Sequence, residues 1–519
     1  MTAEHRDFDP LRPYVTNLDQ DVYCIRGLPP EVAAVLFAYV SRSPNSFRDN
    51  LRALIEAGDL QGLTGRVESA GDEASFAGAK RRAERFHKKW VVGYGHASVA
   101  EHATLRFALE SVSIIASKVL EDNRLGSYTE KSTRYQRFSP DDFIVPPDLA
   151  GSSAGRLLEE TCRMLLARYD AFQGPLERHV ASLWPRVPSV SEGAWRRAVA
   201  ARVFDVSRYL MPAATRTALG VTMNARVATH AINKLLSHPL AECRALGASM
   251  LAEGRKICPT LLRHAGPKAF LSHSAGACAE FGVSLPPAGA GARENSVKLT
   301  AFDADGPERV IKALLFELGG PDAATLDDYV RNLDGATRVR IIEAALAKRD
   351  SHDWPPRAFE MARYVMEVTI DYGAFRDIQR HRMATQLSPP LDVSLGYETP
   401  PELRGAGLEE EYHDTMRQAA TAWGKLAEVS PLVAQYVVPL AYRKRVLFDW
   451  NLREIDHFVK LRSGREGHRS YRHIAWEVAD RVAEVHPELG RILTVDRQEY
   501  SLERLLAEER AARRRAAAE

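Results

Sequence analysis

The chain has 519 residues, which is too long for one ordinary hydrophobic core and predicts two or more domains. Its 45% hydrophobic and 27% charged residues are typical of a soluble globular protein, and its net charge of +2 gives no bulk electrostatic case for nucleic acid or membrane binding. The five cysteines are scattered without a CxxC pair, which indicates reduced thiols in a cytoplasm and argues against a zinc ribbon or a disulfide framework. The sequence has no apolar leader and no long apolar run, so we expect neither secretion nor a membrane span.

The first predicted element follows a polar tail that extends to about residue 20. An apolar run opened by Pro29, Pro30 and Glu31 predicts a helix. Alternating apolar residues over 105–109 then predict a strand that leads into a short helix. The stretch 265–294 is rich in Gly, Ala, Ser and Pro, which predicts a linker.

After the linker, the chain repeats its earlier elements. Residues 296–318 predict a strand, a turn and an amphipathic helix, and they echo residues 22–40. A second alternating strand is predicted at 364–370, again followed by a short helix. The C-terminal tail reads LLAEERAARRRAAAE and is interpreted as a charged helix with a solvated end.

One strand–helix–loop unit is therefore present twice, which indicates an internal duplication. The first copy reads EHATLRFALESVSIIASKVLEDNRLGSYTEKSTRYQRF, and the second reads FEMARYVMEVTIDYGAFRDIQRHRMATQLSPPLD. A second pair of similar segments, 210–236 and 437–462, supports the duplication. We predict an α+β fold of two tandem lobes, each a small sheet covered by helices, over residues 1–264 and 295–519.

Both copies of the second pair contain Asn-x-Arg with a His four residues after the Arg. These motif residues are Asn224, Arg226 and His230 in the first copy, and Asn451, Arg453 and His457 in the second. The spacing puts the Arg and the His on one helical face. The alternative is two unrelated amphipathic helices that share these polar residues by chance.

The densest group of hydrogen-bond donors is Arg380-His381-Arg382. Two guanidinium groups and an imidazole at a helix end suit a phosphate or an electron-rich ring oxygen. The His is expected to be neutral, because neighbouring cations disfavour a third positive charge. The alternative is a solvent-facing basic turn.

Two further polar groups belong to the first copy. His96, Glu101 and His102 have the wrong spacing for the known zinc motifs, so we interpret them as a rim that holds a polar ring system or as a capped helix start. A loop with Ser132 and Arg134 follows, and two such side chains on extended backbone can reach one phosphate.

The order of these motifs resembles the flavin-dependent thymidylate synthases, whose signature is Arg-His-Arg, seven residues and then Ser. The second copy supplies Arg-His-Arg but has Pro390 in place of that Ser and Asp392 in place of the following Arg. The first copy has Asp-Asn-Arg at 122–124, yet it keeps the Ser and the Arg of the 132–134 loop.

The resemblance covers roughly 22–264 and 295–495, and it implies roles for the matching residues. The residues implied to hold FAD are Arg380, His381, Arg382, His96, Glu101, His102, Asn224, Arg226, His230, Asn451, Arg453 and His457. Those implied to bind dUMP are Arg124, Glu130, Ser132, Arg134, Arg208 and Arg462. Arg462 is placed on the uracil and is the catalytic candidate; no metal is implied.

The resemblance also implies a reaction, in which NADPH reduces FAD and methylene-tetrahydrofolate supplies a one-carbon unit to C5 of dUMP or a related uridine nucleotide. Because the two copies have lost different residues, we expect one composite site, with the phosphate loop from the first and the flavin cluster and Arg462 from the second. The alternative is a non-catalytic paralogue that binds FAD or nucleotide, or a partner subunit without activity. A homodimer of the fused chain would match a family homotetramer; nucleic acid and membrane partners are not expected.

Overall fold

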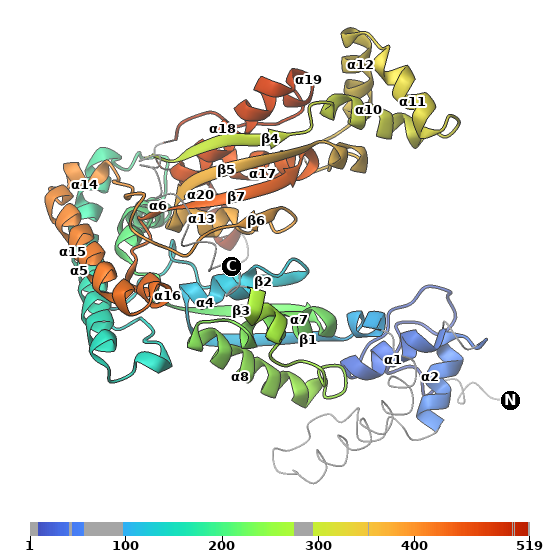
Figure 1. Ribbon diagram of the computed structural model, residues 1–519, viewed down its shortest axis with the longest axis horizontal. Helices are drawn as coiled ribbons and strands as arrows, with labels where there is room; N and C mark the ends of the chain where they lie inside the picture. The colour runs from blue at the N-terminus through green and yellow to red at the C-terminus, as the bar shows by residue number, and fades with distance from the viewer. Residues whose placement is uncertain are drawn as a thin grey trace. The chain divides into compact units, whose positions relative to one another are not determined.

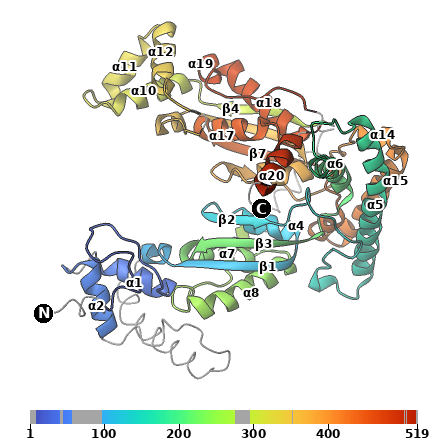
Figure 2. The ribbon, with the colours of Figure 1, turned by 180° about the vertical axis from the view of Figure 1, so that it is seen from behind.

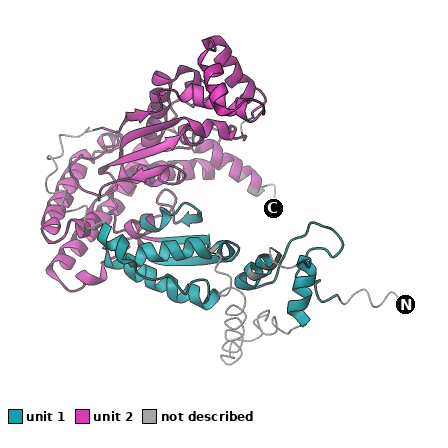
Figure 3. Ribbon diagram, turned by 45° about the vertical axis from the view of Figure 1, so that its right-hand side comes forward, with its two compact units in different colours: residues 1–110, 119–130, 218–285 teal, residues 111–118, 131–217, 286–519 magenta. Residues whose placement is uncertain are grey.

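The computed structural model describes residues 9–40, 44–56, 97–274, 294–350, 352–500, 502 and 504–516. The predicted α+β fold is confirmed: two small sheets with antiparallel strand pairing are covered by helices (Figure 1). The chain forms two compact units (Figure 3). Unit 1 comprises Met1–Glu110, Val119–Glu130 and Ala218–Leu285, and unit 2 comprises Ser111–Lys118, Lys131–Thr217 and Pro286–Glu519.

Unit 1 is organised around a sheet with the strand order β1-β3-β2, whose ends at 111–113 and 216–217 belong to unit 2. In its antiparallel ladder, β2 pairs with β3 from Gly126 opposite Met223 to Glu130 opposite Leu219. The strands are β1 (Thr104–Ser113), β2 (Gly126–Glu130) and β3 (Arg216–Asn224). The helices of unit 1 are α1 (Pro30–Val40), α2 (Phe47–Glu56), η2 (Ala97–Glu101), α7 (Ala225–Leu236) and α8 (Ala241–Ile257). Helix α4 (Ile114–Glu121) is divided, with its residues up to Lys118 in unit 2 and the rest in unit 1.

Unit 2 is organised around a sheet with the order β4-β5-β7-β6. The two central strands share a buried face, because Tyr364, Met366 and Val368 lie opposite Trp450, Phe448 and Val446, and all six side chains are buried. The strands are β4 (Ser296–Phe302), β5 (Arg363–Asp371), β6 (Thr385–Leu387) and β7 (Arg443–Asn451).

The helices of unit 2 pack on this sheet and on one another (Figure 2). The longer ones are α5 (Ser153–Leu183), α6 (Glu192–Ser207), α10 (Gly306–Phe316), α11 (Ala323–Arg331), α12 (Gly335–Leu346), α15 (Glu409–Val429), α17 (Leu452–Ser463), α18 (Arg469–Val485) and α20 (Leu505–Ala516). The short ones are η3 (Pro147–Leu149), η4 (Arg208–Leu210), η5 (Arg357–Met361), α13 (Tyr372–Ile378), α14 (Glu402–Gly405), α16 (Pro431–Ala434), η6 (Gln435–Val437) and α19 (Pro487–Gly490).

The duplication is visible in how equivalent segments pair inside unit 2. Pro212 and Pro439, which open the second pair of similar segments, form an antiparallel bridge. The Ala213 N–H donates to the Val438 carbonyl and the Leu440 N–H donates to the Met211 carbonyl, both at 2.9 Å. This reciprocal pattern is that of a two-fold interface, here formed within one chain.

Most predicted elements are present where the sequence places them. The helix that opens at Pro30, the strand and helix of 296–318, and the strand-to-helix units at β1–α4 and β5–α13 are confirmed. In contrast, β3 and β7 were missed, because the helical motif that follows each of them dominated the interpretation. Their alternating buried residues, such as Leu219, Val221 and Met223, carry the missed signal.

Three other predictions have different outcomes. The linker 265–294 lies mostly outside the described residues, and the lobe boundaries stay a prediction. The charged tail forms α20, but it is more than a solvated end, since α20 packs on α6 and Arg197 pairs with Glu508 at 2.6 Å. Within the described parts of the chain, no helix combines the length and the apolar character needed to cross a bilayer.

Candidate functional site

Two strand-to-helix turns of unit 2 bring the Arg-His-Arg motif to the end of α17. In the first turn, Asp371 ends β5 and caps α13, since its carboxylate accepts the Ala374 N–H at 2.7 Å. In the second turn, Asn451 ends β7 and caps α17 by accepting the Glu454 N–H at 2.9 Å. As a result, Arg462 in the last turn of α17 reaches His381.

His381 is a buried acceptor, with a residue exposure of 3%. Its Nε2 accepts a hydrogen bond from Nε of Arg462 at 2.9 Å, and its ring packs edge-on against Phe458. Burial lowers the pKa of His381 well below its usual value, and the charge of Arg462 lowers it further. The direction agrees with the predicted neutral histidine, although burial contributes more than the neighbouring arginines.

Arg134, the phosphate-loop residue of the first copy, is also buried in unit 2. Its Nε and Nη2 donate to both carboxylate oxygens of Asp205, at 2.5 and 2.7 Å, and its Nη1 donates to the Tyr471 hydroxyl at 3.2 Å. The Ser132 hydroxyl accepts the Arg134 backbone N–H at 3.2 Å. Burial alone would raise the pKa of Asp205, but the charge and hydrogen bonds of Arg134 hold it far below its usual value.

Asp377 lies at the centre of a group of arginines from both halves of the chain. Its carboxylate is 4.0 Å from Nη1 of Arg208 and 3.9 Å from Nη2 of Arg380. Burial would raise the pKa of Asp377, but the charges of Arg134, Arg380, Arg208 and Arg462 lower it well below its usual range. We call Arg134, Arg208, Arg380 and Arg462, together with Asp205 and Asp377, the arginine cluster.

Arg208 is the least satisfied member of the arginine cluster. Its exposure is 1%, and among the residues the structure describes its Nε and Nη2 have no hydrogen-bond partner. Buried donors normally have partners, and an unpaired buried charge is costly, so Arg208 carries donors that an anion could satisfy. The cluster has four guanidinium groups against two carboxylates, and the neighbouring buried carboxylate of Asp371, which interacts with Arg208, offsets part of this excess of positive charge.

The Asn-x-Arg residues do the same structural work in both copies. Asn224 caps α7 by accepting the Val227 N–H at 2.9 Å, as Asn451 caps α17. Arg226 pairs with Glu101 on the surface of unit 1, and Arg453 pairs with Glu360 at 2.9 Å in unit 2. The Arg and the His of each motif thus lie one turn apart on α7 and on α17, while each Asn side chain accepts a backbone N–H and caps its helix.

We expect Asn451→Ala to lower the free energy of unfolding by about 1 kcal/mol, because the Glu454 N–H loses its acceptor. Asn451→Asp, which keeps a capping oxygen, should retain most of that stability. Urea unfolding of the purified variants measures both values. Equal stability of the wild type and the alanine variant would contradict the capping role.

An aromatic stack lies beside the motif in unit 2. The Trp354 ring stacks on His457 with centroids 4.4 Å apart and an interplanar angle of 20°. The Arg453 guanidinium lies 5.1 Å from the Trp354 ring centre. The ring centres of His457 and His381 are 5.2 Å apart. One face of His457, an implied flavin residue, is therefore covered by Trp354.

Two pockets adjoin the implied cofactor residues. In unit 1, a pocket of about 690 Å³ is lined by His102, Phe37 and Phe47 and by the cationic side chains of Arg26 and Arg106. His102 stacks on Phe37 with centroids 5.0 Å apart, whereas the implied His96 lies outside the described residues.

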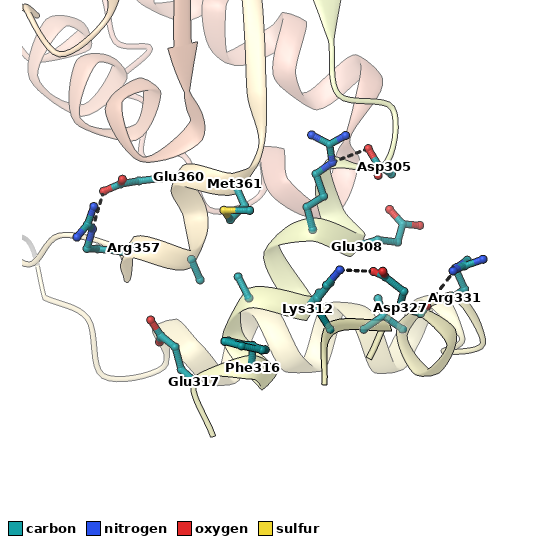
Figure 4. A pocket seen from close by; sticks show the side chains of 15 residues that line it. Asp305, Glu308, Lys312, Phe316, Glu317, Asp327, Arg331, Arg357, Glu360 and Met361 are labelled. Atoms are coloured by element: carbon teal, nitrogen blue, oxygen red, sulfur yellow. Dashed lines mark hydrogen bonds and ion pairs between the residues drawn. The ribbon is translucent and has the colours of Figure 1, made fainter. Parts of the chain in front are cut away.

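In unit 2, a pocket of about 970 Å³ lies between α10, α11 and η5 (Figure 4). Its charged side chains pair with one another, as Lys312 does with Asp327 and Arg357 with Glu360. Glu360 connects the rim of this pocket to Arg453.

The remaining implied residues divide between the two units. Arg124, Glu130 and His230 belong to unit 1, with Arg124 exposed and Glu130 half-buried at the end of β2. Arg382 belongs to unit 2 and is half-buried next to His381. Unit 2 therefore brings together residues of both copies, as the composite site requires, but the role of each residue stays a prediction.

The sequence interpretation missed four side chains that organise the arginine cluster and its surroundings. Asp205 and Asp377 each stand three residues before an implied arginine, in the matching patterns Asp-Val-Ser-Arg and Asp-Ile-Gln-Arg. That repeated spacing was an available signal. No sequence signal pointed to Tyr471 or Glu454, because only the packing of α17 and α18 gives these two side chains their neighbours.

Known protein families include one that matches this chain over most of its length. The family model described as "Thymidylate synthase complementing protein" matches residues 48–260 and 307–488. The chain belongs to this family, so the resemblance to the flavin-dependent thymidylate synthases is confirmed.

Individual relatives fall into two groups. A UPF0159 protein of Chlamydia muridarum is 33% identical over 98% of this chain and 99% of its own length, and one of Thermoplasma acidophilum is 31% identical over 84% and 93%. A flavin-dependent thymidylate synthase of Clostridium tetani is 29% identical over 34% of this chain and 68% of its own length. The relation to the flavin-dependent thymidylate synthase of Clostridium tetani is thus distant, and it covers about one of the two copies of the duplicated chain.

Proposed function

We propose that the chain is a flavin-dependent thymidylate-synthase-like enzyme that binds dUMP, or a related uridine monophosphate, at the arginine cluster. The observation that carries the proposal is Arg208, whose buried Nε and Nη2 have no partner among the described residues. A phosphate monoester has a charge of roughly −1.5 to −2 near neutral pH and three acceptor oxygens. It would therefore offset the excess positive charge of the cluster and supply acceptors to Arg208.

The composition of the cluster supports a single composite site. Arg134 and Arg208 come from the first half of the chain, and Arg380 and Arg462 come from the second, yet all four belong to unit 2. Neither copy alone supplies the excess charge that a dianion needs. Retention of different arginines in the two copies is what a fused site of this kind requires.

The residues of unit 2 also suit FAD. Arg380, which has a half-exposed side chain, and Arg382 flank the buried, neutral His381, and cationic donors of this kind match the pyrophosphate and ring oxygens of a flavin. When bound, the flavin supplies the hydride, with NADPH as its reductant and methylene-tetrahydrofolate as the one-carbon donor. The protein would orient the nucleotide through Arg462 and keep water from the buried His381.

A second candidate is a paralogue that binds nucleotide or FAD without catalysis. It is favoured by side chains already engaged within the protein, since Arg134 is paired with Asp205 and Arg453 with Glu360. Pro390 and Asp392 also replace the Ser and Arg of the family signature. In either case we propose a cytoplasmic homodimer of the fused chain.

Tritium release from [5-³H]dUMP, measured with NADPH, FAD and methylene-tetrahydrofolate, separates the two candidates. Release that depends on every component is expected for the enzyme. A flavin absorbance band and calorimetric dUMP binding without tritium release would support the paralogue instead. Absence of dUMP binding would overturn the arginine cluster as the nucleotide site.

A further inference from the structure

The two ring nitrogens of His381 face different neighbours. Nε2 accepts the Nε–H of Arg462 at 2.9 Å, so Nε2 carries no proton. Burial and the charge of Arg462 lower the pKa of His381 and favour the neutral ring, whose single proton is then on Nδ1. Nδ1 in turn is buried, has no hydrogen-bond partner among the described residues, and lies 3.3 Å from Oε1 of Glu454, just beyond the usual N–H···O distance.

Glu454 is held in place from its backbone. It stands in the first turn of α17, where its N–H donates to the capping side chain of Asn451, and its exposure is 7%. Burial raises the pKa of Glu454 to about 7, while the charge of Arg453 opposes the shift. A buried carboxylate normally has a specific partner, and the unpartnered Nδ1 of His381 lies 3.3 Å from its Oε1, within reach of a hydrogen bond after a small adjustment.

We propose that Glu454 is a positioning residue that holds His381 as its Nδ1–H tautomer, so that Nε2 fixes Arg462 in the arginine cluster. Nε of Arg462 is then committed to His381, a further side-chain hydrogen bond joins the guanidinium to Tyr471, and the remaining terminal N–H groups are available for a ligand. The Arg462 guanidinium also lies 5.5 Å from the Tyr471 ring centre, whose hydroxyl accepts from Arg134. Glu454 thereby acts on the cluster through two intervening side chains.

The other tautomer would undo this arrangement. With its proton on Nε2, His381 would point a donor at the Nε–H donor of Arg462, and the hydrogen bond between them would be lost. The tautomer of a histidine is set by the partner of its second nitrogen. Removal of the Glu454 acceptor should therefore release Arg462, although neither residue touches the other.

The test compares wild type, Glu454→Gln and Glu454→Leu in protein labelled with ¹⁵N-histidine, with His381→Gln used to assign the signal. Glutamine keeps an acceptor oxygen, whereas leucine has a similar size and no acceptor. We expect the Nδ1–H tautomer in the wild type and the glutamine variant, and a shift toward Nε2–H in the leucine variant. A leucine variant that retains the Nδ1–H tautomer, or a wild type with the proton on Nε2, overturns the proposal.

A second readout needs no substrate either. The Arg462 Nε–H should exchange with solvent at least tenfold faster in Glu454→Leu than in wild type, and the glutamine variant should restore slow exchange. Unchanged exchange in the leucine variant would also overturn the proposal. Melting curves establish that each variant is folded.

The consequence for the nucleotide rests on the proposed function. If that function holds, Glu454→Leu should weaken dUMP binding about tenfold, which corresponds to about 1.4 kcal/mol, and Glu454→Gln should restore it. If the wild type binds no dUMP, the proposed function fails, while the tautomer and exchange measurements still decide the role of Glu454.

Discussion

Replacement of Arg208 with methionine should raise the stability of the ligand-free protein and weaken nucleotide binding at the same time. Arg208 is almost fully buried, its Nε and Nη2 lack partners among the described residues, and its Nη1 approaches Asp377 only to 4.0 Å. Its other carboxylate neighbour is Asp371, whose pKa burial raises to about 6 against the charge of Arg208. A buried cation that is compensated this incompletely costs folding free energy, and an apolar side chain of similar length removes that cost. The expected gain is about 1 kcal/mol, at the low end for such replacements.

The same substitution removes donors that a phosphate would use. A charge-assisted pair to a phosphate oxygen in a buried site is among the stronger hydrogen bonds, and loss of such a pair costs roughly 2–5 kcal/mol. We therefore expect dUMP affinity to fall by about two orders of magnitude, as measured by titration calorimetry, while the melting temperature rises.

Arg196 offers a matched control, because it is an exposed arginine on α6 that pairs with Glu192 one turn away. Arg196→Met should change neither stability nor affinity appreciably, since exposed ion pairs contribute little. Opposite signs for the two effects of Arg208→Met would identify a residue kept for ligand binding. Unchanged affinity together with lower stability would instead make Arg208 a structural residue.

The sequence predicted the duplicated plan of this protein because duplication repeats spacings along the chain. The alternation of Tyr364, Met366 and Val368 predicted β5, and the segment after Pro30 predicted α1; both depend on local periodicity. β7 was missed because its alternating residues run directly into a helix, so that one motif concealed two elements. An apolar periodicity cannot assign the secondary structure of a segment in which the period changes from that of a strand to that of a helix.

The electrostatic partners of the charged side chains were harder to predict from the sequence than the helices and strands. Motifs in the sequence drew attention to Arg134 and His381, and the family resemblance implied Arg208 and Arg462. Neither could tell that Arg134 would be neutralised by a carboxylate 71 positions away. That pairing exists only because α6 brings Asp205 to the loop of Arg134. Motifs therefore located the cations of the site, whereas the balance of charge, which decides what the site can bind, required the packed structure.

Removal of the Asp205 carboxylate should destabilise the protein strongly. Both of its oxygens accept from Arg134, and the two side chains are almost entirely buried. Asp205→Leu would leave the Arg134 guanidinium buried without a counter-charge, and the breaking of such a pair costs about 3–5 kcal/mol. The double variant Arg134→Met/Asp205→Leu should recover most of that loss, because an apolar pair of similar volume replaces the ions.

Urea unfolding of the wild type, both single variants and the double variant measures this interaction as a thermodynamic cycle. The pH dependence supplies a second check. The pKa of Asp205 is lower in the folded protein than in the unfolded chain, so its contribution is present above the unfolded pKa near 4 and is lost as the pH falls below it. The wild type should therefore lose more stability than the double variant on acidification below about pH 4. Parallel acid transitions, or a double variant no more stable than Asp205→Leu, would show that the pair does not carry this share of the folding free energy.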